Sequence, residues 1–196
     1  MRRFFVTGVL AIGVAALAQS PQSGSGSGAQ DGPQFTKDNR LMPPKNYREW
    51  IFLSSGLGMT YGPADGAPEA NPRFDNVFVN PSSYKAFLET GAWPDKTMFV
   101  LEVRSSASHG SINQGGHYQT DDVRMSAEVK DSSRFKDKWE FFALPANGQL
   151  GEALPRSAGC FACHSKNGAV DNTFVQFYPT LLPIAKAKGT LKSTEK

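Results

Sequence analysis

The chain has 196 residues, of which 39% are hydrophobic and 20% charged, and its formal net charge is +3. Two of the positive charges are Arg2 and Arg3, so the remainder is close to neutral, without a block of like charge that would attract nucleic acid or an anionic membrane surface. Two cysteines exclude a framework of several disulfides, and the length is enough for one domain with its own core.

The N-terminus is typical of an export signal. A basic start precedes an apolar run from Phe4 to Leu17, which ends in the small-x-small pattern Ala16-Leu17-Ala18. We expect residues 1–18 to be a signal peptide cleaved after about Ala18, and the protein to be periplasmic. The run is short for a membrane span, so no stable membrane association is expected; an uncleaved N-terminal anchor is the alternative.

The Ser/Gly-rich residues 19–40 are expected to form a flexible leader, and residues 41–190 the folded domain. The first elements expected in this domain are a helical turn at 46–50, a strand at 51–53, a Gly/Pro-rich loop at 56–72 and a strand at 76–79. Asn80-Pro81 then predicts a helix N-cap followed by proline at the first helical position, and Gly91 predicts the end of that helix.

The second half predicts strands first and helices afterwards. The elements expected are strands at 97–104, 123–130 and 139–144, a polar loop at 105–121, a helical segment after Pro155, and a last helix at 173–188 interrupted by Pro179 and Pro183. Strands in the middle, helices around and after them, and no βα alternation predict an α+β fold. The sheet is expected to be mainly antiparallel, with helices packed on it and a helical C-terminal segment.

The most informative motif is Cys160-Phe161-Ala162-Cys163-His164. On a helix, positions i, i+3 and i+4 share one face, so two thiols can bind the vinyl groups of a haem while the imidazole reaches its iron. We expect one haem c attached through Cys160 and Cys163, with His164 as axial ligand. The alternatives are a redox Cys-x-x-Cys, half of a zinc site, or chance. Export supports the haem, because c-type haems are attached outside the cytoplasm in bacteria.

The position of the motif excludes the commonest arrangement of soluble c-type cytochromes, which take a methionine downstream of the motif as sixth ligand. The last methionine here is Met125, upstream of the motif. His109 and His117 are either a source of a sixth ligand or surface residues of the polar loop. The expected strands also argue against an all-helical cytochrome c′ bundle.

Four sequence blocks, in the same order, resemble cytochrome P-460 and its relative cytochrome c′-beta. They are PKNYREW at 44–50, VNPSSY at 79–84, EVKDSSRF at 128–135, and the haem motif followed by DNTFVQFYP at 171–179. The resemblance implies a mainly antiparallel sheet with helices packed on it, a homodimer, and a five-coordinate haem. It also implies a distal side open to small nitrogen oxides or hydroxylamine.

The resemblance also shows where this chain departs from the oxidising branch. The lysine that cross-links to the haem in cytochrome P-460 falls on Leu101, and the nearest lysine, Lys96, has the opposite strand parity. A pocket glutamate used in proton transfer falls on Ser126, two residues from Glu128. An arginine of the oxidising members falls on Asp75, with Arg73 an equivalent after a shift.

The resemblance suggests further pocket residues. If Leu101 lies over the haem, its face-mates Phe99 and Val103 line or flank the pocket. Phe52 and Phe78 are candidates for a distal phenylalanine cap, or else plain core. Glu128 is a candidate proton relay if it is buried near the iron, and otherwise a solvated strand residue.

The leading hypothesis is an exported monohaem cytochrome of the cytochrome c′-beta kind, which binds NO or a similar small ligand or passes one electron to a redox partner that the sequence does not identify. One rival is an enzyme, a cytochrome P-460 that oxidises hydroxylamine. The other is a simple electron-transfer module with a six-coordinate haem. Whether the protein is an enzyme therefore stays open at this point.

Overall fold

The structure is a computed structural model that describes residue 1 and residues 31–61, 69–145 and 147–192. The expected signal peptide and most of the expected leader lie outside these ranges. Among the described residues, no helix has both the length and the apolar character needed to cross a membrane.

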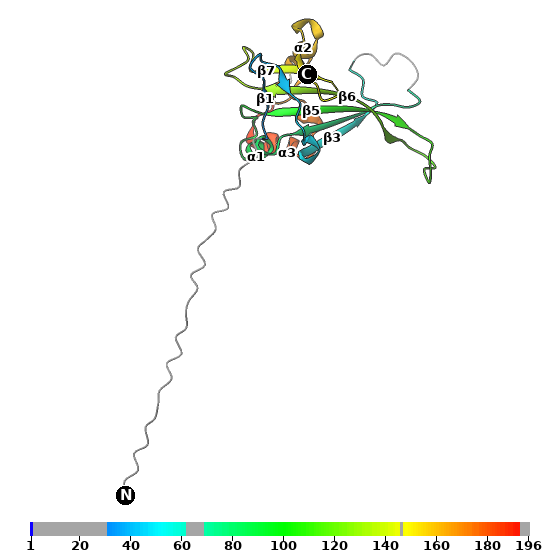
Figure 1. The fold of residues 1–196 in the computed structure, drawn as a ribbon, viewed down its shortest axis with the longest axis horizontal. Helices are drawn as coiled ribbons and strands as arrows, with labels where there is room; N and C mark the ends of the chain where they lie inside the picture. Colours follow the sequence, from blue (N-terminus) through cyan, green and yellow to red (C-terminus); the bar gives the residue numbers. More distant parts are fainter. Residues whose placement is uncertain (2–30, 62–68, 146, 193–196) are drawn as a thin grey trace.

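A six-stranded antiparallel meander forms the centre of the fold, with each strand beside its neighbours in sequence (Figure 1). Its strands are β3 (Ile51–Leu57), β4 (Phe74–Val79), β5 (Met98–Ala107), β6 (Tyr118–Lys130), β7 (Trp139–Leu144) and β8 (Glu152–Ala153). The helices are α1 (Pro81–Thr90), α2 (Cys160–Asn167) and α3 (Leu182–Lys188), with short 3₁₀ turns η1 (Tyr47–Glu49), η2 (Arg156–Ala158) and η3 (Val175–Phe177). This confirms the predicted α+β class with a mainly antiparallel sheet.

The sheet has a core on each face. On β5, Phe99 and Leu101 point to one face and Met98 and Val100 to the other, as strand alternation requires. We call the face of Phe99 the front face and the face of Met98 the back face. The front core contains residues of α1, α3 and η3. The back core contains residues of β2 (Leu41–Met42) and η1's neighbour Trp50, with Phe35 of β1 (Gln34–Phe35) packed against it.

Helix α1 begins and ends where the sequence predicts. Pro81 is its first residue, and Gly91 ends it in the left-handed region with φ of 73°. Asn80 stands at the N-cap position, but its side chain accepts a hydrogen bond from Met98 N at 2.8 Å and does not cap the helix. The Asp31 carboxylate does so, by accepting from Ser82 N at 2.6 Å. Residues 31–40 are thus attached to the domain, and the expected flexible leader is wrong for this part.

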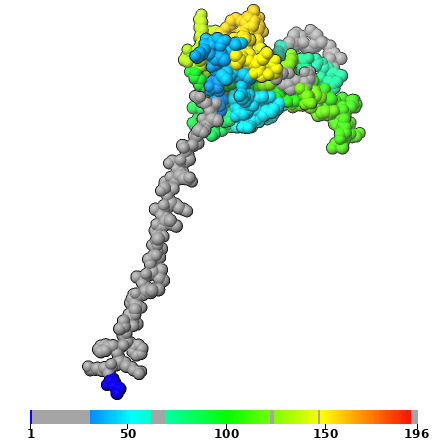
Figure 2. All heavy atoms as spheres, viewed as in Figure 1, coloured from blue at the N-terminus to red at the C-terminus, as the bar shows by residue number. Residues whose placement is uncertain are grey.

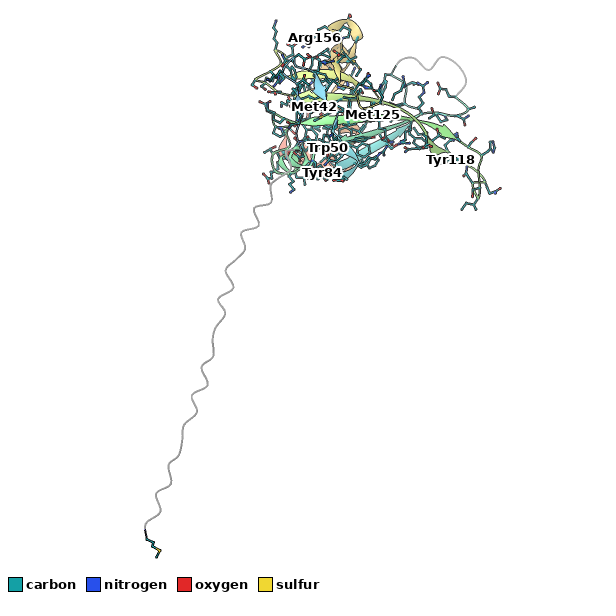
Figure 3. The ribbon with its side chains drawn as sticks, viewed as in Figure 1. Met42, Trp50, Tyr84, Tyr118, Met125 and Arg156 are labelled. Carbon is teal, nitrogen blue, oxygen red and sulfur yellow. The ribbon has the colours of Figure 1, made fainter. Side chains whose placement is uncertain are left out.

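Strands β5 and β6 extend well beyond their predicted ends and form a hairpin arm. Ser106 pairs with Gln119 and Ala107 with Tyr118, after a register shift next to Arg104. The arm projects from the body of the molecule (Figures 1 and 2), with Tyr118 on it (Figure 3). The predicted loop at 105–121 is therefore too long, because backbone pairing in a solvated hairpin needs no apolar alternation.

The C-terminal helix predicted at 173–188 is wrong in its first half. The chain forms the 3₁₀ turn η3, then an irregular stretch around Pro179, and only then α3. Pro183 lies in the first turn of α3, where its missing N–H costs nothing. Because of this break, residues 169–178 lie beside α2 and pack against the front face of the sheet.

Candidate functional site

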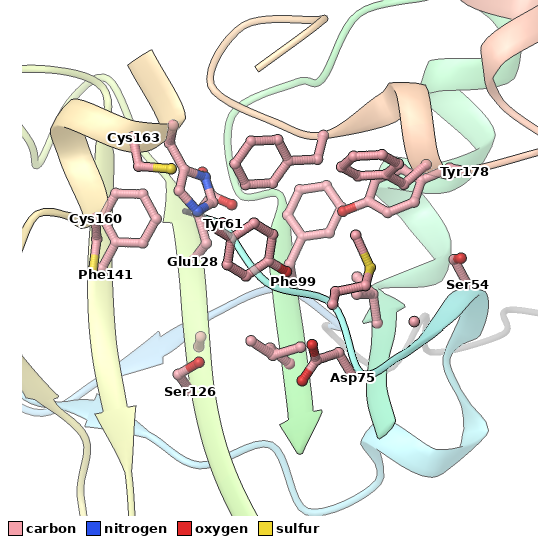
Figure 4. A pocket seen from close by; sticks show the side chains of 18 of the residues that line it. Ser54, Tyr61, Asp75, Phe99, Ser126, Glu128, Phe141, Cys160, Cys163 and Tyr178 are labelled. Carbon is pink, nitrogen blue, oxygen red and sulfur yellow. The ribbon is translucent and has the colours of Figure 1, made fainter. Parts of the chain in front are cut away.

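A cavity of about 330 Å³ lies between the front face of the sheet and α2 (Figure 4). Cys160, Cys163 and His164 line it from α2, and Phe99 and Leu101 line it from β5. Five residues that the sequence indicated, two of them more than fifty positions from the motif, thus come together around one space.

Helix α2 begins with the first cysteine of the motif. Gly159 precedes it with φ of 79°, a left-handed conformation that glycine adopts without strain, and it ends η2 and starts α2. Both cysteines are free thiols of intermediate exposure. Within the described ranges no three His, Cys, Asp or Glu side chains are grouped as a metal site would need, so the zinc alternative gains no support there.

The imidazole of His164 is held in one orientation. Its Nδ1 lies 2.7 Å from the carbonyl oxygen of Asn172. A carbonyl can only accept, so Nδ1 carries the proton, and Nε2 of the neutral ring is left as the nitrogen able to bind a metal. The ring packs between Phe141 and Phe174, with centroid distances of 4.6 and 4.5 Å.

The loop that presents Asn172 is locked onto the helix end. Gly168 N donates to the carbonyl of His164 at 2.9 Å, and a Cβ at Gly168 would come within 2.7 Å of the Asn172 carbonyl carbon. Trp93 Nε1 donates to Thr173 Oγ1 at 2.9 Å and so ties the loop to the front core. The sequence block 171–179 therefore has a physical role, which is to fix the hydrogen-bond acceptor of the histidine.

Glu128 is buried beside the imidazole of His164, on the side of its Nδ1 atom. Its Oε1 is 3.3 Å from Nδ1, yet it makes no hydrogen bond within the described chain, because the Nδ1 proton is already directed at Asn172. Burial raises the pKa of Glu128, and the nearby imidazole offsets this only in part. For His164, burial opposes protonation, but the carboxylate outweighs it and raises its pKa. The solvated reading of Glu128 is therefore wrong.

The strand register arranges the front face in rows across the sheet. Phe99 pairs with Glu128, and Glu128 with Phe141, in the row nearest His164. The next row is Val77, Leu101 and Ser126, and the row beyond is Asp75, Val103 and Arg124. The wall of the cavity is thus apolar near its centre and becomes polar and charged away from α2.

Phe52 and Phe78 do not line the cavity, and their prediction as a distal cap is wrong. Phe52 pairs with Phe78, and Phe78 with Val100, so both lie on the back face. Their rings contact each other at 5.6 Å, and Phe52 is 53% exposed. A β-bulge between Phe52 and Ser54 hides the parity of β3, because after it Ser54 lines the cavity.

His109 and His117 lie on and beside the tip of the arm and do not line the cavity. His109 is exposed, and His117 Nε2 lies 3.1 Å from the carbonyl oxygen of Ala70. These positions agree with their reading as surface residues.

Among the lining side chains that sequence reasoning did not predict are Met59 and Tyr61, and it named Asp75 only as the position of an arginine in the oxidising members. Figure 4 shows Tyr61 extending into the cavity and Asp75 on the wall away from Cys163. Burial raises the pKa of Asp75, although Arg124 and Arg73 oppose this. Partial burial, and then the charge of Asp75, raise the pKa of Tyr61, although this residue stays largely exposed. The glycines and prolines of residues 56–72 predicted only a loop, so the sequence carried no signal for Met59 or Tyr61.

The residues present fit a c-type haem. Two thiols and an imidazole share one face of a helix beside an apolar wall, and the imidazole tautomer leaves Nε2 free to act as a ligand. The Asn172 carbonyl that accepts from Nδ1 is the kind of second partner found beside metal-binding histidines.

Comparison with known families agrees with this site. The family model described as Cytochrome P460 matches residues 44–175, which include the haem motif, Leu101 and Glu128. No curated protein matches the chain.

Proposed function

This chain belongs to the cytochrome P460 family and is therefore a haem-binding cytochrome; we propose that it is an exported protein with a single haem c, which binds small nitrogen oxides, NO in particular, or passes single electrons. The observation that carries the proposal is the geometry of His164. A protonated Nδ1 bonded to Asn172 presets the neutral imidazole as a ligand through Nε2. When bound, the haem supplies an iron that changes its oxidation state by one electron and takes up a diatomic ligand.

Covalent attachment follows from the two free thiols on α2. Cys160 and Cys163 would hold the haem by thioether bonds to its two vinyl groups, an addition of S–H that needs no oxidant. We expect the haem to stay attached under denaturing conditions and to be seen by haem staining. Loss of the stain from the wild type after acid-acetone extraction would rule this out, and Cys160→Ser with Cys163→Ser is the matched control.

The lysines of the described chain support ligand binding over hydroxylamine oxidation. Leu101 stands at the centre of the cavity wall, and no lysine of the described ranges lines the cavity. Lys96 pairs with Asp131, and Lys130 donates to Asp171 at 2.8 Å and to the Trp93 carbonyl at 2.7 Å. Both ammonium groups are thus engaged elsewhere, and a cross-link of the cytochrome P-460 kind is not expected.

Hydroxylamine oxidation remains a second candidate, because the polar wall at Asp75, Tyr61 and Ser126 contains groups that can hold or move protons. Optical spectra separate the candidates. A cross-linked haem has a red-shifted Soret band, an open five-coordinate haem is high-spin, and a six-coordinate haem is low-spin. We expect a high-spin protein that binds NO when ferrous and turns over hydroxylamine slowly or not at all. Robust turnover without a shifted Soret band would restore the enzyme hypothesis.

Leu101→Lys sharpens this test. It supplies the missing side chain on the correct face, but proton transfer would still depend on Glu128 or the polar wall. We expect it to remain a poor catalyst even where a cross-link forms. Export to the periplasm and assembly as a homodimer are parts of the same proposal. They are tested by cell fractionation, by the N-terminal sequence of the mature protein, and by its mass in solution.

A further inference from the structure

A second hollow of about 130 Å³ continues the front face beyond the main cavity. It is lined by Arg73, Val103, Ser105 and Arg124. Val103 pairs with Arg124, two residues along the strands from the pair Leu101 and Ser126, so its floor lies about 7 Å beyond the row that lines the haem cavity. Arg73 directly precedes β4 and enters the hollow beside them. The two sites share one sheet face.

The two arginines of this hollow differ from the other described arginines because they form no ion pair with a described carboxylate. The described ranges contain seven arginines, and five of them form an ion pair with a carboxylate. The two that form none among the described residues are Arg73 and Arg124, the same two that line the hollow. Arg73 and Arg124 are both exposed, so an anion can reach them from solvent, and an anion bound by both would offset the repulsion between their charges. Asp75 lies close enough to feel both charges but forms no ion pair within 4 Å with either.

We propose that Arg73 and Arg124 form a binding site for a planar oxyanion with two oxygens, of the carboxylate or nitrite type, at the edge of the haem cavity. The planar fork of a guanidinium matches two such oxygens with two parallel hydrogen bonds. This chemistry has two possible sources, a carboxylate of the haem itself or a free small oxyanion that enters or leaves the cavity. The inference rests on the proposed haem site and adds to it the class of ligand accepted at its rim.

The experiment uses the full-length holoprotein and the variants Arg73→Gln, Arg124→Gln and Arg124→Lys, with Arg40→Gln as a control that removes one exposed charge elsewhere. Binding of sodium formate and sodium nitrite is measured by calorimetry at constant ionic strength, and the reduction potential of the haem is measured without added anion. Arg124→Lys keeps the charge but removes the fork, so it separates hydrogen bonding from a general charge effect.

A site for free oxyanions predicts that the wild type binds formate and nitrite and that both glutamine variants bind them about tenfold or more weakly, whereas Arg40→Gln does not. A site filled by the haem carboxylates predicts no such uptake. The glutamine variants then lower the reduction potential more than Arg40→Gln does, because a nearby positive charge favours the reduced state, and Arg124→Lys reproduces part of the shift. Either result supports the proposal.

Glutamine variants that match Arg40→Gln in both anion uptake and potential overturn the proposal. That outcome leaves the haem assignment intact, because haem staining and NO binding are recorded on the same samples. A wild type that carries no covalent haem would instead contradict the proposed function, and the calorimetric arm would still test the oxyanion site on that protein.

Discussion

Glu102 and Glu128 are buried on opposite faces of one sheet, on neighbouring strands, and only Glu102 has a full set of partners. Glu102 is 1% exposed and accepts hydrogen bonds from Tyr47, from Arg48 at 2.6 Å and from Arg104 at 2.6 Å. Glu128 is 9% exposed, and its Oε1 has no hydrogen-bond partner in the described chain. Donors from the back face surround the first carboxylate, whereas the second faces His164.

The pKa values follow the same division. Burial alone would raise the pKa of Glu102, but the hydrogen bonds from Arg104 and Tyr47 outweigh burial and lower it. Burial, followed by the hydrogen bond to Glu102, raises the pKa of Tyr47 to about 12. For Glu128 burial prevails and its pKa is raised. A buried acid that is fully bonded stabilises the fold, and a buried acid with an oxygen that accepts no hydrogen bond marks a candidate functional site.

The largest effect is expected from removing Glu102. Glu102→Ala leaves Arg104 and Tyr47 half-buried without their acceptor, and loss of one member of a buried ion pair typically costs about 3–5 kcal/mol. Urea denaturation should show the loss, with the haem spectrum of the remaining folded protein unchanged. A free energy of unfolding within about 1 kcal/mol of the wild type would show that the back-face cluster is not structural.

Gly168→Ala should have the next largest effect, and it acts on the front face. The new Cβ would press on the Asn172 carbonyl and on the His164 carbonyl oxygen, so the loop must move away from α2. We expect a loss of roughly 1–3 kcal/mol together with a weaker Nδ1–H bond to Asn172. The iron–histidine stretching band in resonance Raman spectra should shift as this bond weakens. Gly115→Ala is the control, because its Cβ would meet nothing within 4 Å and its backbone is not in the left-handed region. An unshifted band would show that Asn172 does not set the ligand.

Much of this site could be predicted from the sequence, and the reason is local spacing. Cys160, Cys163 and His164 are spaced i, i+3 and i+4 on one helix, so their common face follows from helix geometry alone. That Leu101 and Phe99 share one face follows from alternation along one long strand, and the resemblance to cytochrome P-460 predicts that this face lines the pocket. These predictions need no knowledge of how distant segments pair.

Predictions were wrong for residues whose position depends on how two strands pair. Phe78 lies on the back face because β4 pairs with β5 in a register that no single strand reveals, and the bulge in β3 hides the parity of Phe52. Met59 and Tyr61 enter the cavity from a segment whose breakers gave no periodicity. Asp31 belongs to the domain only because its carboxylate reaches α1.

Replacing Glu128 should change stability less than replacing Glu102. Glu128→Gln removes a buried acid that already lacks a partner for Oε1, so we expect a change within about 1 kcal/mol, or a gain. Glu102→Gln, which breaks two charged pairs, is the matched comparison and should cost more. Thermal unfolding of both variants measures the difference. Equal losses would contradict the division between the two faces.

The smallest effect is a pH dependence. The pKa of Glu102 is lower in the folded state than in the unfolded chain, so folding favours its ionised form. Its contribution is complete above the ordinary pKa of a glutamate and is lost as the pH falls through that value towards the folded-state pKa. Between about pH 5 and pH 3, the wild type should lose more stability than Glu102→Gln does. If the stability of the two proteins changed with pH in parallel, Glu102 would not be the source of the pH dependence.

The central claim is that one haem is bound to α2 with His164 as its axial ligand and with its other side open to a small ligand. The optical spectrum of the ferrous protein, recorded before and after addition of NO, tests it most directly. We expect a high-spin ferrous spectrum, and we expect added NO to convert it at once to the spectrum of the NO complex. A low-spin ferrous spectrum that NO leaves unchanged would contradict it.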